Sequence, residues 1–370
     1  MNKKIVLSSN TSWYIYNFRS STISALTKKG VAVHCVSPRD DYTSRLINEL
    51  GVKWHEVDID NKGSNPFRDI KFFIDMVVIY YRLRPDVVLN FTIKNNIYGT
   101  LAAKLFGPMI VNNVSGLGTV FIKKSITTKI VKLLYKLSQP FADVVFCQNS
   151  DDLYLLTQQR LVSPFKIKLL PGSGVNVTRF NPGDCNIRDR GVIKFIFVGR
   201  MLRDKGVVEL IKAAHYLDSQ GYKFTLKLCG GVDPKNLSGF SKEEIESWCS
   251  IPMIEWLGSC ENMPEIYGEA DCVVLPSYRE GLPRTLLEAG AMGLPSVTTD
   301  VPGCRHVIED GFNGFLCKEK DHISLANSMR RVLELSNEEY MFLSKNARER
   351  VIERFDENIV VDKTLEVLGL

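Results

Sequence analysis

The sequence predicts an α/β protein of two domains, each built on a parallel β-sheet with helices on both faces. Three observations predict this fold class. The chain has 370 residues, which is too long for one ordinary α/β core and suits two domains of under about 200 residues each. Short apolar runs alternate with segments of helical periodicity, as in parallel strands joined by right-handed crossovers. This series also starts a second time, after an irregular junction near residues 171–190.

The first series begins at the N-terminus and ends before the junction. We expect strands at residues 4–8, 31–37, 53–57, 86–90, 110–114 and 143–148, and helices at residues 17–29, 42–50, 69–83, 96–106 and 129–141. Gly30 and Gly51 follow the first two helices, where glycine accepts the left-handed conformation that ends a helix. Pro85 precedes the fourth strand and cannot continue the helix before it.

The second series begins once Pro171–Gly174 and a polar segment have interrupted the first. We expect strands at residues 193–198, 224–229, 254–257, 272–276 and 296–298, and helices at residues 207–218, 242–249 and 338–355, the last running on to residue 370. These segments predict an N-terminal domain at residues 1–172, a C-terminal domain at residues 173–351, and a C-terminal helix at residues 352–370 that packs back on the first domain. Ligands of such sheets bind at the carboxyl ends of the strands.

Composition restricts the function only broadly. The net charge of +5 and the pI of about 8.6 suit an acidic ligand or an anionic membrane surface, and they do not indicate nucleic-acid binding. The nine cysteines form no CxxC pair, which favours reduced thiols in a reducing compartment over disulfides or a zinc site. No stretch reaches the roughly 20 apolar residues that span a bilayer, so we expect a soluble or peripheral protein.

The segment from Ser277 to Glu288 carries the sharpest chemical signal. A polar loop with Gly281 follows the strand at residues 272–276, and Pro283 stands where a helix would begin. A helix start offers unpaired amides to a phosphate, and Gly281 allows a ligand close to the backbone. Glu280 and Glu288 have the residue type that accepts hydrogen bonds from sugar and ribose hydroxyls. Taken alone, both also fit solvated carboxylates at a helix N-terminus.

A second cluster follows the strand at residues 193–198, in the segment from Gly199 to Gly206. Arg200 and Lys205 lie on a loop at a strand's carboxyl end and before a helix. Such cations neutralise a diphosphate, arginine as a fork and lysine as a point charge. Solvated loop charges explain either cluster alone, but both clusters together in one domain favour a shared pyrophosphate-bearing ligand.

These two clusters resemble the retaining glycosyltransferases of family 4. Glu280 and Glu288 match the E-x7-E signature, and Gly199-Arg200 with Lys205-Gly206 match the G-R-x4-K-G element. The resemblance covers essentially the whole chain, including the loop of Gly116, Leu117 and Gly118 and the hinge at residues 173–176. It implies the GT-B fold, two Rossmann-like domains facing each other across a cleft, and it is strongest to bacterial enzymes of surface-polysaccharide assembly that add N-acetylhexosamine to a polyprenyl-diphosphate-linked sugar.

The resemblance assigns a role to each matching position. In the donor site it implies that Arg200 and Lys205 stabilise the leaving diphosphate, that Glu280 contacts the donor sugar, and that Glu288 binds the ribose. It further implies donor contacts from Gly199, Ser277, Gly281, Leu282 and Pro283, base-pocket walls from Leu257 and Met263, and an acceptor side of the cleft formed by Gly116, Leu117, Gly118, Tyr14, Thr92, Lys94 and Asn95.

The chain departs from the family pattern in two places. Many members have a histidine near the donor sugar where Ile93 stands here, so Thr92, Lys94 or Asn95 would take its place. The N-terminal loop, which often carries paired glycines, reads Asn10-Thr11-Ser12-Trp13-Tyr14. Donor sugar and acceptor specificity therefore stay open.

The predicted reaction is transfer of a hexose or N-acetylhexosamine from a UDP-sugar to a saccharide acceptor, lipid-linked by resemblance, with retention. The leaving phosphate would take the acceptor's proton, so catalysis would depend on charge neutralisation and positioning. We expect no metal and no cofactor, because the two cations stand in for a metal at the diphosphate. The alternatives are a nucleotide-sugar epimerase or hydrolase of the same fold and a non-catalytic nucleotide-sugar-binding subunit.

Weaker signals have simpler explanations or concern the membrane. Asp58-Ile59-Asp60 imitates a metal-binding D-x-D but lies in the other half from the donor clusters, so a solvated loop is favoured. From Lys123-Lys124 through Lys129, Lys132 and Lys136, cations stand among apolar residues. This pattern fits either the polar face of an ordinary core helix or contact with anionic lipid at the inner face of the cytoplasmic membrane. Residues 69–83 are a second such candidate.

Overall fold

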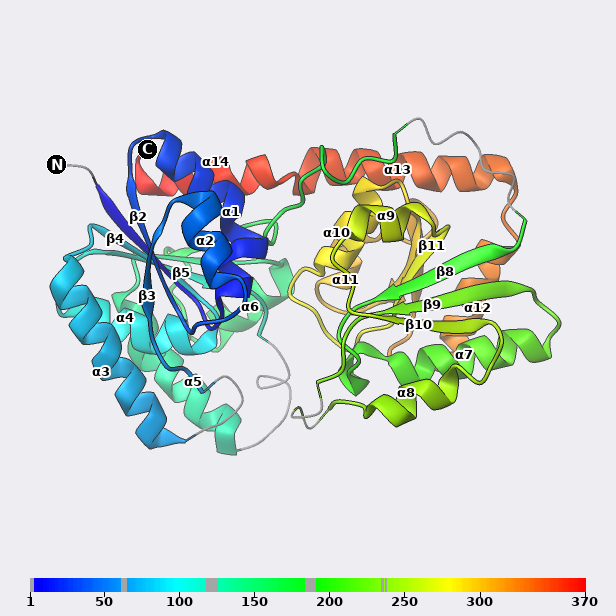
Figure 1. Ribbon diagram of the computed structural model, residues 1–370, viewed down its shortest axis with the longest axis horizontal. Helices are drawn as coiled ribbons and strands as arrows, with labels where there is room; N and C mark the ends of the chain where they lie inside the picture. Colours follow the sequence, from blue (N-terminus) through cyan, green and yellow to red (C-terminus); the bar gives the residue numbers. More distant parts are fainter. Residues whose placement is uncertain (1–2, 61–64, 118–125, 184–190, 234–235, 237) are drawn as a thin grey trace. The chain divides into compact units, whose positions relative to one another are not determined.

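The computed structural model describes residues 3–60, 65–117, 126–183, 191–233, 236 and 238–370, in two compact units (Figure 1). The first unit comprises Met1–Ser173 with Glu357–Leu370, and the second comprises Gly174–Asp356. In each unit, every strand pair for which a register is defined is parallel. The C-terminal segment therefore returns to the first unit.

The first unit is built on a seven-stranded sheet with the order β3-β2-β1-β4-β5-β6-β7. Its strands are β1 (Lys4–Ser8), β2 (Ala32–Ser37), β3 (Lys53–Glu56), β4 (Val87–Phe91), β5 (Met109–Val114), β6 (Val144–Cys147) and β7 (Ile167–Leu169). Its helices are α1 (Ser12–Lys28), α2 (Thr43–Leu50), α3 (Pro66–Leu83), the π-helix η1 (Asn95–Gly99), α4 (Thr100–Lys104), α5 (Ile126–Ser138), the 3-10 helix η3 (Gln139–Phe141), α6 (Ser150–Gln158) and α14 (Glu357–Leu368).

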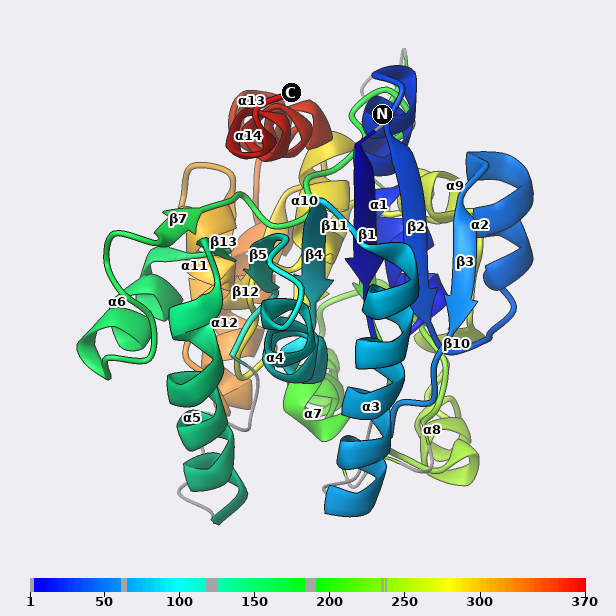
Figure 2. The ribbon, with the colours of Figure 1, turned by 90° about the vertical axis from the view of Figure 1, so that its left-hand side faces the viewer.

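Helices cover both faces of this first sheet. Successive side chains of a strand point to opposite faces, and along β1 Ile5 and Leu7 belong to one hydrophobic cluster while Val6 belongs to another. The cluster with Ile5 takes side chains from α1 and α14, and the cluster with Val6 takes them from α3 and α5. Figure 2 shows α3, α4 and α5 together on the latter face. Burial on both faces explains why these strands read as continuous apolar runs.

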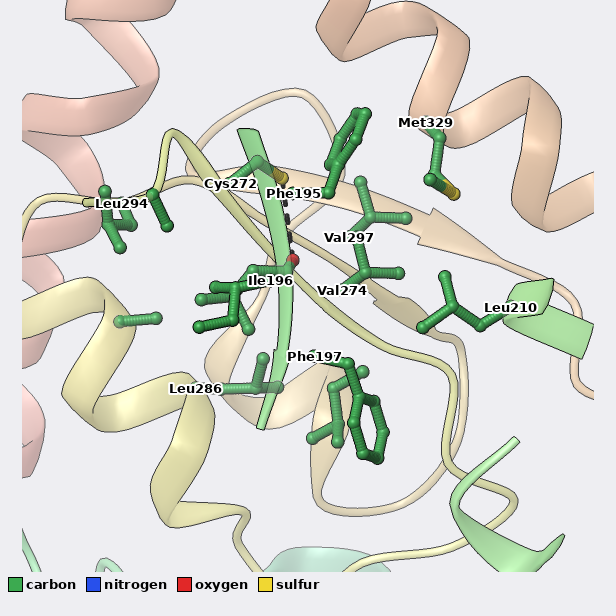
Figure 3. Close-up of a cluster of buried hydrophobic side chains, with 14 of the residues drawn as sticks. Phe195, Ile196, Phe197, Leu210, Cys272, Val274, Leu286, Leu294, Val297 and Met329 are labelled. Atoms are coloured by element: carbon green, nitrogen blue, oxygen red, sulfur yellow. Dashed lines mark hydrogen bonds between the residues drawn. The ribbon is translucent and has the colours of Figure 1, made fainter. Parts of the chain in front are cut away.

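The second unit is built on a six-stranded sheet with the order β10-β9-β8-β11-β12-β13. Its strands are β8 (Ile193–Val198), β9 (Phe224–Cys229), β10 (Ile254–Gly258), β11 (Cys272–Leu275), β12 (Ser296–Thr299) and β13 (Gly314–Cys317). Its helices are the 3-10 helix η4 (Arg203–Lys205), α7 (Val207–Ser219), α8 (Lys242–Trp248), α9 (Met263–Gly268), α10 (Arg284–Ala291), α11 (Cys304–Val307), α12 (His322–Leu333) and α13 (Asn337–Phe355). Figure 3 shows part of its core, where Phe195, Ile196 and Phe197 lie among side chains from α7, α10 and α12.

The strand orders confirm the predicted fold class of two Rossmann-like halves. In each sheet the chain adds strands outward on one side of the first strand and then crosses to add the remaining strands on its other side, as in doubly wound sheets. Several details differ from expectation, and strands β7 and β13 were not among the predicted ones. The helix predicted at residues 96–106 is a π-helix followed by a short α-helix. The terminal helix is two helices, separated at Asp356, whose ψ of 137° is not helical. Pro283 is the N-cap of α10, with ψ 115°, so the helix begins at Arg284.

Candidate functional site

The predicted donor residues gather on loops at the carboxyl ends of three neighbouring strands of the second unit. Strand β8 lies between β9 and β11, so the loops that follow these three strands leave one edge of the sheet side by side. The loop after β8 carries Arg200 and Lys205, and the loop after β11 carries Glu280. This edge is where ligands of doubly wound sheets bind.

Two glycines let the backbones of these loops contact each other directly, with no side chain between them. At Gly206, φ is 73°, and an added Cβ would lie 2.0 Å from the carbonyl oxygen of Pro276. At Gly230, φ is 153°, and an added Cβ would lie 1.8 Å from the carbonyl oxygen of Gly199. The amide of Tyr278 also donates to the carbonyl of Asp204 at 2.9 Å. The loops after β8, β9 and β11 therefore form one continuous backbone surface.

Lys205 and Glu280 form an ion pair between two of these loops. The Lys205 ammonium donates to Oε1 of Glu280, and the two side chains are 24% and 13% exposed. Such partial burial strengthens a charge interaction relative to bulk water. Because an ammonium has three donors, the pair leaves Lys205 with donors for a further anion.

Glu288 lies in the second turn of α10 and has two partners. Arg284 Nε donates to its Oε1 at 2.8 Å, and the Tyr267 hydroxyl donates to its Oε2 at 3.0 Å. Tyr267 is fully buried, and burial together with Glu288 raises the pKa of its phenol well above the usual value. The carboxylate of Glu288 is thus fixed in direction, as a group that accepts hydroxyl hydrogen bonds must be.

Arg200 is placed differently from the other charged residues predicted for the donor site. Its Nη1 lies 3.8 Å from Oδ2 of Asp233, and 64% of its side chain is exposed. A long exposed guanidinium held by one weak pair has several rotamers open to it. The structure thus brings Lys205 and Glu280 together and keeps Arg200 near the loop after β9.

The remaining residues of the donor prediction frame these charges. The loop at Ser277 is held by Thr299, whose hydroxyl donates to the Ser277 carbonyl, and Leu282 is buried. Gly303 lies behind Glu280 and Gly281, whose carbonyl oxygens are 2.6 and 2.7 Å from where its Cβ would stand. Leu257 and Met263 are partly buried against the core of this unit.

Buried thiols lie beside both carboxylates. Burial raises the pKa of Cys304 to about 12, and the nearby Glu280 adds to the rise. Burial likewise raises the pKa of Cys229 to about 12, and the neighbouring Cys260 and Glu288 contribute smaller increases. These thiols stay protonated at neutral pH, so they are poor nucleophiles.

The residues predicted for the acceptor side belong to the first unit, where some of them line a cavity. A cavity of ≈ 240 Å³ is lined by Asn10, Thr92, Ile93, Lys94, Ser115 and Gly116. Of the other predicted residues, Asn95 and Leu117 are buried, Tyr14 packs against Phe91 with ring centroids 5.9 Å apart, and Gly118 lies outside the described residues.

Thr92 and Lys94 are held firmly in the wall of this cavity. Thr92 has φ 72°, a left-handed conformation that is unusual for a β-branched residue, and its hydroxyl donates to Oδ1 of Asn95 at 3.1 Å. Lys94 forms an ion pair with Asp69 at 2.5 Å. Asp69 also accepts from the Tyr98 hydroxyl at 3.1 Å. Strained backbone supported in this way is typical of functional sites.

Sequence reasoning missed several partners of the donor residues. Arg284 stands four residues before Glu288 on one helix, a spacing that indicates an ion pair and would have identified it. Tyr267 reaches the site from helix α9 and Asp233 from the loop after β9, and neither gave a local signal. In the part of the chain that the structure describes, no three His, Cys, Asp or Glu side chains are grouped to hold a metal ion.

Family comparisons divide the chain as the sheets do. Residues 4–149 match the family described as glycosyl transferase 4-like, and residues 186–350 match the family described as glycosyl transferases group 1. An N,N'-diacetylbacillosaminyl-diphospho-undecaprenol alpha-1,3-N-acetylgalactosaminyltransferase of Campylobacter jejuni is 29% identical over 95% of both chains. A UDP-Gal:alpha-D-GlcNAc-diphosphoundecaprenol alpha-1,3-galactosyltransferase of Escherichia coli is 28% identical over 80% of this chain and 78% of its own.

Solved structures share the fold over the whole chain. Anabaena HepE in complex with UDP and glucose superposes with a TM-score of 0.81 at 17% identity and covers 100% of both chains. Sucrose-phosphate synthase from Thermosynechococcus elongatus gives a TM-score of 0.80 at 19% identity, covering 100% of this chain and 98% of its own. At such identities the likeness concerns the fold alone.

Proposed function

Because this chain belongs to the glycosyl transferases of group 1 and the 4-like family, we propose that it moves a hexose or N-acetylhexosamine from a UDP-sugar to a saccharide carried on a polyprenyl diphosphate. The reaction would serve bacterial polysaccharide or glycan synthesis. Two relatives named for undecaprenyl-diphosphate-linked acceptors align with most of the chain. The observation that carries the proposal is the Lys205–Glu280 pair at the carboxyl ends of β8 and β11.

In this proposal Lys205 stabilises the leaving nucleoside diphosphate. Glu280 holds the ammonium at the loop junction before the donor arrives, so little reorganisation is needed when charge develops on the leaving oxygen. Glu280 also faces the donor sugar, and Arg200 joins at the diphosphate from its exposed position near Asp233. Glu288, fixed by Tyr267 and Arg284, accepts from the ribose hydroxyls.

Transfer proceeds with retention of the anomeric configuration. The acceptor hydroxyl attacks on the face from which the diphosphate departs, and a leaving phosphate oxygen takes its proton. The chain therefore contributes positioning and positive charge, and no protein carboxylate needs to act as a base. Product stereochemistry read from the anomeric proton coupling of the new linkage tests this part, and inversion would contradict it.

We propose that transfer needs no metal ion, because Lys205 and Arg200 supply the positive charge that Mg²⁺ supplies elsewhere. EDTA should leave the rate of transfer unchanged within about twofold, which is small beside the several kcal/mol that a catalytic metal contributes. Loss of transfer in EDTA with recovery on adding Mg²⁺ or Mn²⁺ would show that the assignment is wrong.

The proposal places the protein peripherally at the cytoplasmic membrane. Among the residues that the structure describes, no helix is long and apolar enough to cross a membrane. The proposed acceptor is anchored in lipid, so the enzyme has to meet it at the bilayer surface.

The decisive experiment combines a donor panel with a transfer assay. Thermal shift with UDP, GDP and their sugars should identify UDP, and the matching UDP-sugar should then label a bacterial lipid extract only when enzyme is present. Release of free UDP without acceptor would instead indicate a hydrolase, and isomerised donor an epimerase. Binding with no turnover on any acceptor would indicate a non-catalytic subunit.

A further inference from the structure

Helix α3 (Pro66–Leu83) is apolar on the face that points away from its own core. Phe72, Met76 and Tyr80 are its buried residues. Its exposed large apolar residues are Phe67, Ile70, Ile74, Val78 and Tyr81, with Phe67 80% exposed. At 100° per residue these five positions fall within about 80° of arc, roughly opposite the buried ones. A helix of a globular domain normally turns its polar side to this position.

Helix α5 (Ile126–Ser138) repeats the same arrangement. Its buried residues are Thr128, Tyr135 and Ser138. Its exposed apolar residues are Ile126, Ile130, Leu133 and Leu137, all at least half exposed. These four fall within about 60° of arc, again on the side away from the core. Neither exposed stripe is needed to bury the helix against the sheet.

The two stripes belong to one face of the first unit. Figure 2 shows α3 and α5 running alongside each other with α4 between them, and both helices begin at the same end. Buried side chains of both helices, Phe72 and Tyr135 among them, enter the same hydrophobic cluster beneath them. We call the nine exposed residues of the two stripes the α3–α5 face. Exposed apolar residues gathered on one face in this way mark an interaction site.

Cations flank the α3–α5 face. Helix α5 contains Lys129, Lys132 and Lys136 and no Asp or Glu, and the three lysines lie along one side of its stripe. On α3, Lys71 and Arg82 lie along the stripe. Asp75 lies on the same side of the helix, Lys71 is paired with Asp58 at 3.6 Å, and Asp69 is turned inward to Lys94. Long basic side chains beside an apolar stripe are typical of helices that lie in a membrane interface, where the stems bury and the charges reach lipid phosphates.

We infer that the α3–α5 face docks on an anionic lipid bilayer, with both helices lying in the plane of the interface. This inference identifies the surface through which the enzyme would reach its acceptor. It rests on the proposed function, which supplies the lipid-linked acceptor. It also connects the bilayer with the acceptor side, because Asp69 in the first turn of α3 holds Lys94 in the wall of the ≈ 240 Å³ cavity. A bilayer explains both the apolar stripes and the row of lysines along one side of the α5 stripe.

Vesicle flotation of the whole chain tests this inference. The wild-type protein should float with vesicles of phosphatidylcholine and phosphatidylglycerol and partition at least tenfold less onto phosphatidylcholine alone. Ile74→Gln, Val78→Gln, Leu133→Gln and Leu137→Gln together should weaken partitioning at least 10²-fold, since each removes an exposed apolar side chain that the bilayer would bury. Lys129→Glu, Lys132→Glu and Lys136→Glu together should do so by a similar factor on the anionic vesicles.

Matched controls come from the second unit. Met341→Gln with Ile352→Gln removes comparably exposed apolar residues from α13, and Lys212→Glu with Lys345→Glu reverses exposed charges. Both controls should float like the wild type. Equal losses in the controls, or wild-type binding that ignores lipid charge, would overturn the inference. So would light scattering that finds a wild-type dimer and a monomeric glutamine variant, because the face would then join two copies.

Transfer to a short-chain acceptor in detergent separates this inference from the proposed function. The glutamine variant should keep wild-type turnover there while losing activity on acceptor in anionic vesicles. If the wild type floats but transfers no sugar to either acceptor, the proposed function fails and the docking surface stands. If it transfers sugar in detergent but does not float, the docking surface fails alone.

Discussion

At the scale of single residues, the donor site depends on how charges are held before a ligand arrives. Lys205 has one hydrogen bond to Glu280 and is largely buried. This bond fixes the position of the ammonium, and its other donors are still able to bind an anion. Glu288 is held by a phenol and a guanidinium. Arg200, in contrast, is mostly exposed. Preorganised charge is what electrostatic catalysis requires, and Lys205 meets that requirement better than Arg200.

Lys205→Ala should lower turnover by about 10²–10³-fold, the usual loss for one electrostatic donor. The reason is the lost stabilisation of the leaving diphosphate, so the reduction should fall mainly on kcat. Arg200→Ala should also reduce turnover. Steady-state kinetics with the matched UDP-sugar measure both.

The exposed Lys212 on α7 provides the control for Lys205, and Lys212→Ala should leave kcat unchanged. Removing Lys205 also leaves the Glu280 carboxylate without this ion-pair partner. The effect of Lys205→Ala should therefore be measured in Glu280→Gln protein as well. If Lys205→Ala has no further effect in that background, the ammonium acts only by neutralising Glu280, and the proposed role at the diphosphate is wrong.

At the scale of elements, local pattern and tertiary packing disagree most around β4. The sequence predicts a helix at residues 96–106, and the structure has a π-helix over Asn95–Gly99. A buried network underlies it, in which Asn90 donates to Asn112 at 2.9 Å and Asn112 donates to Gln139 at 2.8 Å. These side chains come from two strands and a helix that are far apart in the sequence. The hydrogen bonds between them therefore cannot be predicted from any short segment of the sequence. The amide of Asn96 in this π-helix donates to the carbonyl of Thr92 at 2.9 Å, beside the cavity.

The β2–β3 pair contains a histidine contact that should make the first unit sensitive to acid. His34 Nδ1 lies 3.0 Å from His55 Nε2. Burial, with His55 and Lys53 nearby, lowers the pKa of His34 to about 4, and burial also lowers the pKa of His55. Below pH 6.5 the unfolded chain then binds more protons than the folded one. Stability is therefore fully present above that pH and lost as the pH falls towards 4.

We expect the first unit to lose roughly 1–2 kcal/mol of unfolding free energy between pH 7 and 4.5 from this contact. His34→Gln should flatten that part of the pH profile, whereas His215→Gln on α7 should not, because His215 is exposed. Chemical denaturation of Trp248→Phe/Trp256→Phe protein, in which only Trp13 and Trp54 of the first unit fluoresce, measures this. An unchanged pH slope in His34→Gln would contradict the assignment.

At the scale of the whole molecule, the two units hold different parts of the proposed reaction. Lys205, Glu280 and Glu288 all lie within Gly174–Asp356, and the acceptor-side cavity lies within Met1–Ser173. Each unit has its own sheet and its own hydrophobic clusters. A nucleotide should therefore stabilise one unit more than the other.

UDP at about 100 times its Kd should raise the Tm of the second unit by roughly 5–10 °C, because such saturation adds about 2.7 kcal/mol. Each unit has two tryptophans, Trp13 and Trp54 in the first and Trp248 and Trp256 in the second. In Trp13→Phe/Trp54→Phe protein, fluorescence reports only the second unit, and its transition should shift. A shift of the first unit's transition alone, seen in Trp248→Phe/Trp256→Phe protein, would contradict this placement of the donor site.

The sequence by itself determined the two-unit α/β fold and the two loops that carry Lys205 and Glu280. Strand and helix periodicity and the turn residues beside them are local properties, so they can be recognised in the sequence without knowledge of tertiary contacts. Tertiary structure alone decided that Lys205 meets Glu280 and that Tyr267 meets Glu288, since the chain returns to one sheet edge from distant positions. It also decided which side of α5 faces the core, because that helix is apolar on two sides and only packing distinguishes the face carrying Tyr135 from the one carrying Leu133.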